Sequence, residues 1–321
     1  MSTPILEIFL TPDDLVEQLR SDARSGLTAQ AKWLAPVWFY DARGSELFEQ
    51  ITELPEYYPT RTERALLAEC AGEIASLTTP KMLIELGSGS SEKTRLLLGA
   101  MSGSLHTYVP QDVSVTALEG AAKAISTEFP GIDVIGVVSD FTGSLHHLPS
   151  GGRRAVAFLG GTLGNLIPGE RAQFLAGVAE VLGRGESLIL GVGLVTDPAV
   201  LVPAYDDSAG VTAQFNLNVL GVLNKQLGAN FPLEAFRHVA LWDAENQWIE
   251  MRLEALRDLS VRIEDLDLDV TFAAGEQLRT EISAKFTVDG ITAELEAAGF
   301  RVQKAWTDDN QRFALLCAER V

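Results

Sequence analysis

From residue 81 onward the sequence alternates short apolar runs with amphipathic segments, and this alternation restricts the possible folds more than any other feature. Repeated strand–helix units build a parallel sheet with helices on both faces. Ligands of such sheets bind in the loops beyond the carboxyl ends of the strands, so we expect functional residues there. The expected strands span residues 81–86, 106–110, 133–138, 155–159 and 187–192. One expected helix ends near residue 100, and two others span residues 114–128 and 168–182.

The C-terminal residues predict how this sheet is completed. A helix is expected at 291–298, followed by Gly299, and two strands at 300–306 and 312–318 flank the polar turn TDDNQ. Such a hairpin places the C-terminal segment in the same domain as the strand–helix repeats. Residues 197–285 are not needed by the minimal sheet and are predicted to be an insertion.

Length, charge and hydropathy disfavour several classes of protein. With 321 residues and 46% hydrophobic content, the chain can bury a sizeable core. Its formal net charge of -19 would repel a phosphate backbone, which disfavours nucleic-acid substrates. The longest apolar runs, such as 187–195, are too short to cross a bilayer, and the first residues lack the basic region of a signal peptide. We therefore expect a cytoplasmic protein with neither a membrane nor a nucleic-acid partner.

The cysteines and histidines show neither a disulfide pattern nor a metal-ligand pattern. Cys70 and Cys317 are too few for a disulfide framework and lack paired ligand spacing, so two reduced thiols are expected. The four histidines also lack the spacing of a metal site, and no metal cofactor is expected.

Three of the predicted strands are followed by residues suited to binding a nucleoside. Gly87 and Gly89 follow the first strand, where glycine lets a ligand approach the backbone and the next helix offers free N–H groups. Asp112 ends the second strand and can accept hydrogen bonds from ribose hydroxyls. Asp140 and Phe141 end the third, where a carboxylate can accept from an adenine amino group and a ring can pack on the base. Together these loops predict a nucleoside cofactor site.

The glycine loop also argues against a dinucleotide. Glu92 stands where the G-x-G-x-x-G fingerprint needs its third glycine, which disfavours NAD. Lys93, at the start of the following helix, could pair with a carboxylate of the cofactor or could be a solvated helix lysine. Taken alone, Gly87 and Gly89 could form an ordinary strand-to-helix turn.

Long motifs along nearly the whole chain resemble those of one family, the histidine Nα-methyltransferases of ergothioneine biosynthesis. One departure is Gly161, where relatives often carry serine, and it puts only the detail of that loop in doubt. The motifs are WFYDARGSELFEQIT at 38–52, LPEYYPTRTE at 54–63, ELGSGSSEKT at 85–94, FLGGTLGNL at 158–166, AYDDSAGVTAQFN at 204–216 and TEISAKF at 280–286.

The resemblance implies both a fold and an activity. The fold would be an α/β Rossmann-like class I methyltransferase sheet, dependent on S-adenosyl-L-methionine (SAM), with an added substrate-binding domain. The activity would be the transfer of three methyl groups from SAM to the α-amino group of L-histidine, which gives hercynine. A monomer is implied as well.

The resemblance and the order of elements together predict four segments. Residues 1–75 are expected to be a mostly helical segment with an aromatic loop that joins the substrate lid, and residues 76–196 the methyltransferase core. Residues 197–285 are expected to be an inserted substrate-binding domain. Residues 286–321 are expected to supply the helix and hairpin that complete the sheet.

The resemblance also assigns residues to the two ligands. The amide of Asn165 can orient the amino and carboxylate groups of an amino acid, and aromatic faces at Tyr40 and Phe48 would favour a methylated ammonium. Asn165 and Tyr40 are therefore the expected catalytic residues, and either a tyrosine or solvent is expected to take the proton of the amine. The expected cofactor contacts are Gly87, Lys93, Asp112, Asp140 and Phe141. The expected histidine contacts are Tyr57, Asn165, Tyr205, Glu281 and Ser283, with Phe48 and Met251.

Structural roles stay open for several of these residues on the sequence alone. Asn165 could serve only its glycine-rich turn, and Tyr57 could belong to a packed aromatic corner. Tyr40 and Phe48 could be ordinary core residues.

Glu281 and Ser283 stand two residues apart in an extended segment and therefore face the same side. A carboxylate and a hydroxyl could converge there on the two nitrogens of an imidazole, or both could be exposed strand residues beside Lys285.

Two rival functions also stay open. A catalytically silent cofactor-binding partner would have gaps in its pocket, whereas competent groups occupy all the matched positions. An enzyme for another aromatic amino acid or a small amine would be indicated by an apolar residue in place of Glu281.

Overall fold

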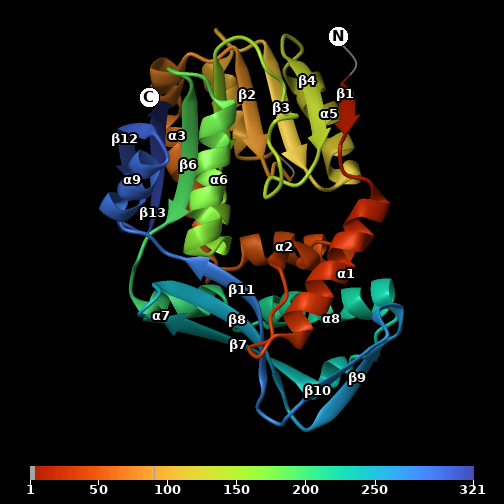
Figure 1. Cartoon of the computed structure of the whole chain (residues 1–321). Coiled ribbons are helices and arrows are strands. Elements are labelled where there is room, and N and C mark those ends of the chain that lie inside the picture. The colour runs from red at the N-terminus through yellow and green to blue at the C-terminus, as the bar shows by residue number, and fades with distance from the viewer. Residues whose placement is uncertain (1–3, 90) are drawn as a thin grey trace. The chain divides into compact units, whose positions relative to one another are not determined.

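The computed structural model describes residues 4–89 and 91–321. These residues form two compact units, each assembled from segments that are distant in the sequence (Figure 1). Unit 1 contains the described residues up to Thr11, Pro59–Val195 and Phe286–Val321, and unit 2 contains Pro12–Tyr58 and Thr196–Lys285. Within the described ranges, no helix is both long and apolar enough to cross a membrane.

Unit 1 is built on a mixed sheet whose strands are β1 (Ile5–Ile8), β2 (Met82–Leu86), β3 (Thr107–Asp112), β4 (Asp133–Val138), β5 (Arg154–Phe158), β6 (Ser187–Gly193), β12 (Phe300–Thr307) and β13 (Phe313–Arg320). Their order is β1-β4-β3-β2-β5-β6-β13-β12. Neighbours from β1 to β6 are parallel, whereas β13 is antiparallel to both β6 and β12. The predicted parallel sheet and its C-terminal hairpin are confirmed, because buried apolar strands joined by helices must pair in parallel.

The helices of unit 1 are α3 (Tyr58–Thr78), α4 (Thr94–Met101), α5 (Val115–Glu128), α6 (Pro168–Val181) and α9 (Val288–Ala297). The first three bury their apolar sides in one core, in which Leu67, Leu97 and Ile125 pack together with Leu83 of β2. Phe174 of α6 packs instead on Phe158 of β5, with ring centroids 4.6 Å apart. Because successive strand residues alternate in direction, these two contacts lie on opposite faces of the sheet.

The strand β1 was not predicted from the sequence. It pairs in parallel with β4, where Leu6 lies opposite Gly136. A Cβ atom on Gly136 would come within 2.6 Å of Leu6 Cδ1, so the glycine gives the edge strand room to dock. Ile5 and Ile8 stay exposed, and a four-residue edge strand without a buried stripe gives little periodic signal.

Unit 2 combines helices with two small antiparallel sheets. Its helices are α1 (Pro12–Thr28), α2 (Ala42–Glu53), α7 (Pro198–Leu201) and α8 (Val211–Leu227), and the short 3-10 turns that matter below are η1 (Pro36–Phe39) and η3 (Val202–Ala204). Its strands are β7 (Phe236–Asp243), β8 (Trp248–Ala255), β9 (Leu259–Ile263), β10 (Leu268–Phe272) and β11 (Gln277–Ala284). The strands β11, β8 and β7 form one sheet, and β9 with β10 forms a hairpin. The helix α8 packs against β7 and β8.

The boundary between the units at 195/196 lies one residue from the expected 196/197, and the boundary at 285/286 lies at the expected position. The first 75 residues are divided differently from the expectation, because β1 and most of α3 belong to unit 1. Leu67 and Ile74 of α3 are buried in the core of that unit. The assignment of residues 197–285 to substrate binding stays a prediction.

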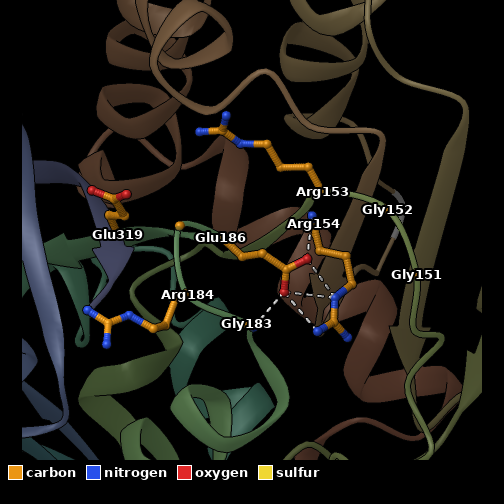
Figure 2. Close-up of a pocket in the computed structure, with 9 residues that line it drawn as sticks. Gly151, Gly152, Arg153, Arg154, Gly183, Arg184, Glu186 and Glu319 are labelled. Atoms are coloured by element: carbon orange, nitrogen blue, oxygen red, sulfur yellow. Dashed lines mark hydrogen bonds and ion pairs between the residues drawn. The ribbon is translucent and has the colours of Figure 1, made fainter.

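A hollow of about 540 Å³ lies at the amino ends of β5 and β6, where Arg154 and Glu186 meet (Figure 2). The predicted cofactor loops follow the carboxyl ends of the strands, so this hollow is not the candidate active site. In Figure 2, Glu186 turns toward Arg154, whereas Arg153 and Arg184 point away from that pair.

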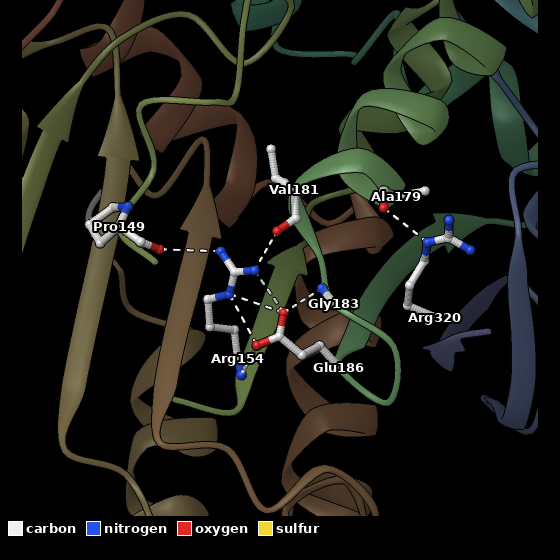
Figure 3. A network of polar contacts seen from close by, with 7 residues as sticks. All are labelled: Pro149, Arg154, Ala179, Val181, Gly183, Glu186 and Arg320. Atoms are coloured by element: carbon white, nitrogen blue, oxygen red, sulfur yellow. Dashed lines mark hydrogen bonds and ion pairs between the residues drawn. The ribbon is translucent and has the colours of Figure 1, made fainter. Parts of the chain in front are cut away.

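The pair formed by Arg154 and Glu186 joins the loop before β5 to the end of α6 and the loop that follows it (Figure 3). Glu186 accepts hydrogen bonds from Arg154 N at 2.8 Å, from Arg154 Nη2 at 2.8 Å and from Gly183 N at 2.7 Å. Arg154 also donates to the carbonyls of Pro149 and Val181. Burial raises the pKa of Glu186, but these donors outweigh burial, and the pKa lies below its ordinary value.

Replacing Glu186 by alanine is expected to lower the free energy of unfolding by about 3 kcal/mol, because Arg154 would keep a buried charge without a partner. The side chains of Arg154 and Glu186 are only 11% and 10% exposed. Urea unfolding measures the change. Glu128→Ala is the control: it removes the partner of Arg95 in a more exposed pair of the same unit, so a loss below about 1 kcal/mol is expected. Equal losses in the two variants would contradict the role of the buried pair.

Candidate active site

The loop after β2 is fastened to the end of β3 by two hydrogen bonds. Gly87 N donates to Gln111 Oε1 at 3.2 Å, and Gly89 N donates to Asp112 Oδ2 at 3.0 Å. Gly87 and Gly89 have φ angles of 66° and 49°, in the left-handed region that favours glycine. The glycines therefore allow the sharp turn, and the side chains of β3 fix its position.

Asp112 is held in place by backbone donors on both carboxylate oxygens. Besides Gly89 N on Oδ2, Ser114 N donates to Oδ1 at 3.0 Å. Burial raises the pKa of Asp112, and the backbone hydrogen bonds oppose that shift. Each carboxylate oxygen can accept more than one hydrogen bond, so Asp112 keeps the capacity to bind two hydroxyl groups of a ligand.

Gln111 links two of the predicted cofactor loops, a role that was not predicted from the sequence. Its side chain has no exposed surface, and its Nε2 donates to the backbone O of Ser139 and, at 3.1 Å, to Ser139 Oγ. One amide therefore joins the loop after β2 to the end of β4. A glutamine inside a largely buried strand was the signal for it in the sequence.

Phe141 brings the loop after β4 to the glycine loop. A Cβ atom on Gly87 would lie 3.7 Å from the ring of Phe141, in ordinary van der Waals contact. The ring of Phe141 packs edge-to-face on Phe158 at 5.1 Å. In the same loop, Asp140 Oδ1 accepts from Thr142 N at 2.8 Å. The structure therefore brings together the glycine, aspartate and phenylalanine loops that the sequence predicted.

One observation tests directly whether this set of loops fits a polar ligand. The hydroxyl oxygen of Ser88, between the two glycines, is buried and has no hydrogen-bond partner in residues 4–89 and 91–321. An unpaired buried hydroxyl is unfavourable, and a polar ligand would satisfy it. Across the same described ranges, no group of three histidine, cysteine, aspartate or glutamate side chains could hold a metal ion.

Lys93 lies beside the same loops, but its partner was not foreseen. Its ammonium donates to Glu63 of α3, whose side chain has no exposed surface. The two oxygens of Glu63 also accept from Gly160 N, at 2.8 and 3.0 Å. Glu63 stands four and seven residues before Leu67 and Cys70 on the apolar side of α3. A charged residue on that side was the signal that could have revealed it.

Glu85 is a second buried carboxylate, one residue before the end of β2. It accepts from Thr94 Oγ1 and from Tyr108 Oη, and Tyr108 Oη lies 2.8 Å from Ser91 Oγ. Burial raises the pKa of Glu85 to about 7, although the two hydroxyl donors and Lys93 oppose that shift. Glu85 therefore titrates near neutral pH.

Asn165 ends a 3-10 turn at Thr162–Asn165, in the loop after β5, and is half-buried. Gly161 opens this turn with a φ of 71°, and Gly164 N donates to its carbonyl at 2.9 Å. Asn165 thus lies in unit 1 beyond the carboxyl end of a strand, as predicted.

In unit 2, the predicted aromatic residues form one continuous row. The ring of Tyr40 packs edge-to-face on Phe48 at 5.6 Å, Phe48 on Tyr57 at 6.2 Å, and Tyr57 on Tyr205 at 6.3 Å. Phe215 of α8 supports the row from Tyr40 and Phe48. Tyr40 is the most exposed of them, at 44%. The row therefore runs from the core of unit 2 to the solvent-exposed ring of Tyr40, and a role of Tyr40 and Phe48 beyond packing stays a prediction.

At the other end of this row, the Tyr205 hydroxyl lies 2.8 Å from Ser283 Oγ. Lys285, which immediately follows β11, donates from Nζ to both hydroxyls, at 2.8 and 2.7 Å. Burial, and then the charge of Glu281, raise the pKa of Tyr205 above its ordinary value. The structure therefore brings Tyr57, Tyr205 and Ser283 together and adds Lys285, for which the sequence analysis assigned no role.

Glu281 and Met251 face each other across the strand pair β11–β8. The register shifts between Arg279 and Glu281, and beyond this bulge it is regular through Ser283, so Glu281 and Ser283 face the same side of the strand, as predicted. Met251 and Ser283 are buried and Glu281 is half-buried, so Glu281 and Ser283 are not fully exposed strand residues.

His238 also has a role that was not predicted from the sequence. Asn216 Oδ1 accepts from Thr280 Oγ1 at 2.6 Å, which orients the amide so that Nδ2 donates to His238 Nδ1 at 2.8 Å. His238 Nε2 therefore carries the hydrogen and donates to the carbonyl of Tyr205 at 2.8 Å. Because Nδ1 accepts and Nε2 donates, the neutral ring fixes the backbone of Tyr205, and burial lowers the pKa of His238.

A family model for histidine-specific, SAM-dependent methyltransferases matches residues 19–320. The chain belongs to this family. The sheet of unit 1 is therefore the Rossmann-like class I sheet of a SAM-dependent methyltransferase, as predicted from the sequence.

Relatives match this family member over most of its length. Histidine N-alpha-methyltransferase of Mycolicibacterium smegmatis is 51% identical over 314 residues, which cover 97% of this chain and 98% of the relative. The protein of the same name from Mycobacterium tuberculosis is 51% identical over 304 residues, 94% and 95% of the two chains. Ergothioneine biosynthesis protein 1 of Neurospora crassa is 29% identical over 87% of this chain, but over only 32% of its own length.

In this histidine-specific methyltransferase, Glu85→Gln is expected to remove a pH dependence of stability. The folded-state pKa of Glu85, about 7, lies above the ordinary value of 4.5, so ionisation disfavours the folded state. The stability contributed by protonated Glu85 is therefore present below about pH 4.5 and is lost as the pH rises through about 7. Glutamine keeps the shape of the side chain without ionising. The free energy of unfolding of Glu85→Gln relative to that of wild type should therefore increase by on the order of 2 kcal/mol between pH 5 and pH 8.

Urea unfolding at several pH values measures this difference. The exposed Glu92→Gln is the control, and its curve should follow that of wild type. If the curves of Glu85→Gln and wild type ran parallel over the whole range, Glu85 would not be the titrating group.

Proposed function

We propose that this chain transfers methyl groups from SAM to the α-amino group of L-histidine and forms the trimethylated betaine hercynine, a step in ergothioneine biosynthesis. One observation carries the proposal: 51% identity with the histidine N-alpha-methyltransferase of Mycolicibacterium smegmatis along nearly the whole of both chains. The loops of unit 1 and the aromatic row of unit 2 agree with it, since they supply groups for a nucleoside cofactor and for an aromatic amino acid.

In this proposal the loops of unit 1 bind SAM. Gly87 lets the cofactor approach the backbone, and Asp112 accepts hydrogen bonds from the ribose hydroxyls. Asp140 accepts from the adenine amino group, and Phe141 packs on the base. Lys93 holds the carboxylate of the methionine part, with Glu63 fixing its ammonium.

The residues of unit 2, together with Asn165, recognise histidine. Tyr205 donates to the α-carboxylate, and the amide of Asn165 orients the amino and carboxylate groups. Glu281 and Ser283 bind the two nitrogens of a neutral imidazole, with Tyr57 as a further partner. Met251 packs beside them.

The protein contributes alignment more than acid–base chemistry. Bound SAM supplies a methyl group activated by the sulfonium, and methyl transfer is an in-line displacement that depends on orientation. The aromatic faces of Tyr40 and Phe48 stabilise an amine that becomes a quaternary ammonium. The proton of the attacking amine goes to solvent or to a tyrosine, and Tyr40 is the most exposed tyrosine of the row.

The remaining parts of the proposal concern the setting in which the enzyme works. We infer a cytoplasmic monomer that uses free histidine and needs no metal. The net charge of -19 supports a small-molecule substrate over a nucleic acid.

The direct test is mass spectrometry of histidine incubated with the protein and SAM. Mono-, di- and trimethylated histidine are expected to appear in turn, with hercynine as the final product. Tryptophan and phenylalanine serve as competing substrates. Methylation of either in preference to histidine would contradict the proposed substrate.

Two variants should separate the two ligands. Glu281→Ala is expected to raise KM for histidine about tenfold or more and to narrow the preference over tryptophan, because a buried hydrogen-bonding group of the substrate loses its partner. Its affinity for SAM should stay nearly unchanged. Asp112→Ala is the matched variant at the other ligand: it should weaken SAM binding about ten- to a hundredfold.

Calorimetric titration with SAM and the ratio of kcat/KM for histidine and tryptophan measure these effects. An unaltered ratio in Glu281→Ala would mean that other residues recognise the imidazole. Unchanged SAM affinity in a folded Asp112→Ala variant would remove the ribose assignment.

A further inference from the structure

Lys285 is a buried ammonium beside the proposed histidine contacts, and nothing above assigns it a ligand. Its side chain lies just after β11, and the residue is only 6% exposed. Nζ donates to Tyr205 Oη at 2.8 Å and to Ser283 Oγ at 2.7 Å, and these two oxygens are 2.8 Å apart. The ammonium and the two hydroxyls therefore form a closed triangle, which we call the Lys285 triangle.

The charge of Lys285 has no direct counterion in the described part of the chain. No carboxylate of residues 4–89 and 91–321 forms an ion pair with its Nζ, and the third N–H of the ammonium has no partner there. Burial lowers the pKa of Lys285 to about 7, and the charge of Glu281 opposes that shift. A buried ammonium without a paired anion is unfavourable, so an anionic ligand beside it would be stabilising.

The Lys285 triangle also determines which hydrogens are left to donate to a ligand. An ammonium has only donors, so Tyr205 Oη and Ser283 Oγ both accept from Lys285. At most one of the two hydroxyl hydrogens is then used between Tyr205 and Ser283. At least one hydroxyl hydrogen and the third N–H of Lys285 are left to donate to a ligand. A carboxylate, which is an anion that only accepts, matches this set of donors.

We propose that Lys285 is a positioning residue: because it donates to both hydroxyls, the Tyr205 hydroxyl is left to donate, and the Lys285 ammonium and Tyr205 together receive the α-carboxylate of the amino-acid substrate while Ser283 stays with the imidazole. This inference rests on the proposed function, since it takes histidine as the ligand. It adds a reason why the substrate is an amino acid rather than an amine: the free carboxylate supplies the counterion that Lys285 lacks.

The test compares histidine with histamine, which has the same imidazole and amine but no carboxylate. Wild type is expected to bind histidine more tightly than histamine in calorimetric titrations with SAM present. Lys285→Met should weaken histidine binding about ten- to a hundredfold, the range of a hydrogen bond to a charged group, and should weaken histamine binding by a much smaller factor. The preference for histidine over histamine should therefore collapse.

A matched control exists in the same unit. Lys32 has a side chain that is 13% exposed, and its ammonium lies 4.9 Å from the Phe272 ring centroid, as that of Lys285 lies 4.9 Å from the Tyr205 ring centroid. Lys32 is paired with Glu276, away from the aromatic row. Lys32→Met should keep the preference of wild type, which separates the loss of any buried lysine from the loss of this one.

Tyr205→Phe provides a readout that a merely structural role would not move. If Lys285 acts through Tyr205, the effects of Lys285→Met and Tyr205→Phe on the preference should not add in the double variant. Thermal unfolding confirms the fold of each variant, and Lys285→Gln carries the same comparison if Lys285→Met does not fold.

Three outcomes overturn the proposal. An equal loss for histidine and histamine in Lys285→Met would place Lys285 at the imidazole or in the fold. Additive effects with Tyr205→Phe would remove the positioning role. A preference that stays at its wild-type value would show that the carboxylate binds elsewhere. A wild type that fails to bind histidine overturns the proposed function itself, whereas these three outcomes leave that function standing.

Discussion

The cofactor loops of unit 1 depend on one buried carboxylate. Glu63 has no exposed surface, accepts from Gly160 N with both oxygens and binds the ammonium of Lys93. It occupies space that only glycine leaves open, because a Cβ atom on Gly191 would lie 2.2 Å from Glu63 Oε1. A buried charge is tolerated only when it is paired and hydrogen-bonded. The helix α3 and the loops after β2 and β5 must therefore be assembled together before Glu63 is satisfied.

The two ends of the same sheet use buried polar groups differently. At the amino ends, Arg154 and Glu186 satisfy each other and neighbouring backbone groups, which leaves a structural brace. At the carboxyl ends, Ser88 Oγ is buried with no partner among the residues that the structure describes, and Asp112 keeps lone pairs beyond its backbone donors. In unit 2, the buried ammonium of Lys285 likewise forms no ion pair with a carboxylate of the described residues. A buried polar group that lacks a hydrogen-bond partner or a counterion is suited to binding, because a ligand can supply the missing partner.

Much of this architecture could be predicted from the sequence because its signals are local. The buried runs of β2 to β6 and the C-terminal hairpin were predicted from apolar periodicity, and the residues at the strand ends, such as Gly87 and Asp112, follow from the rule for parallel sheets. The strand β1 was missed because a short edge strand has no buried stripe. Glu63 and Gln111 were missed because their roles depend on partners 97 and 28 residues away.

The sequence by itself determined the strand–helix order, the family and the residues that can carry each interaction, because periodicity and long motifs are properties of the linear chain. Only the tertiary structure decided which of those residues meet. It paired Lys93 with Glu63, set Tyr40, Phe48, Tyr57 and Tyr205 in one row, and placed Lys285 against two hydroxyls. The physical reason is that desolvation and hydrogen-bond satisfaction act between atoms that folding brings together, whatever their separation along the chain.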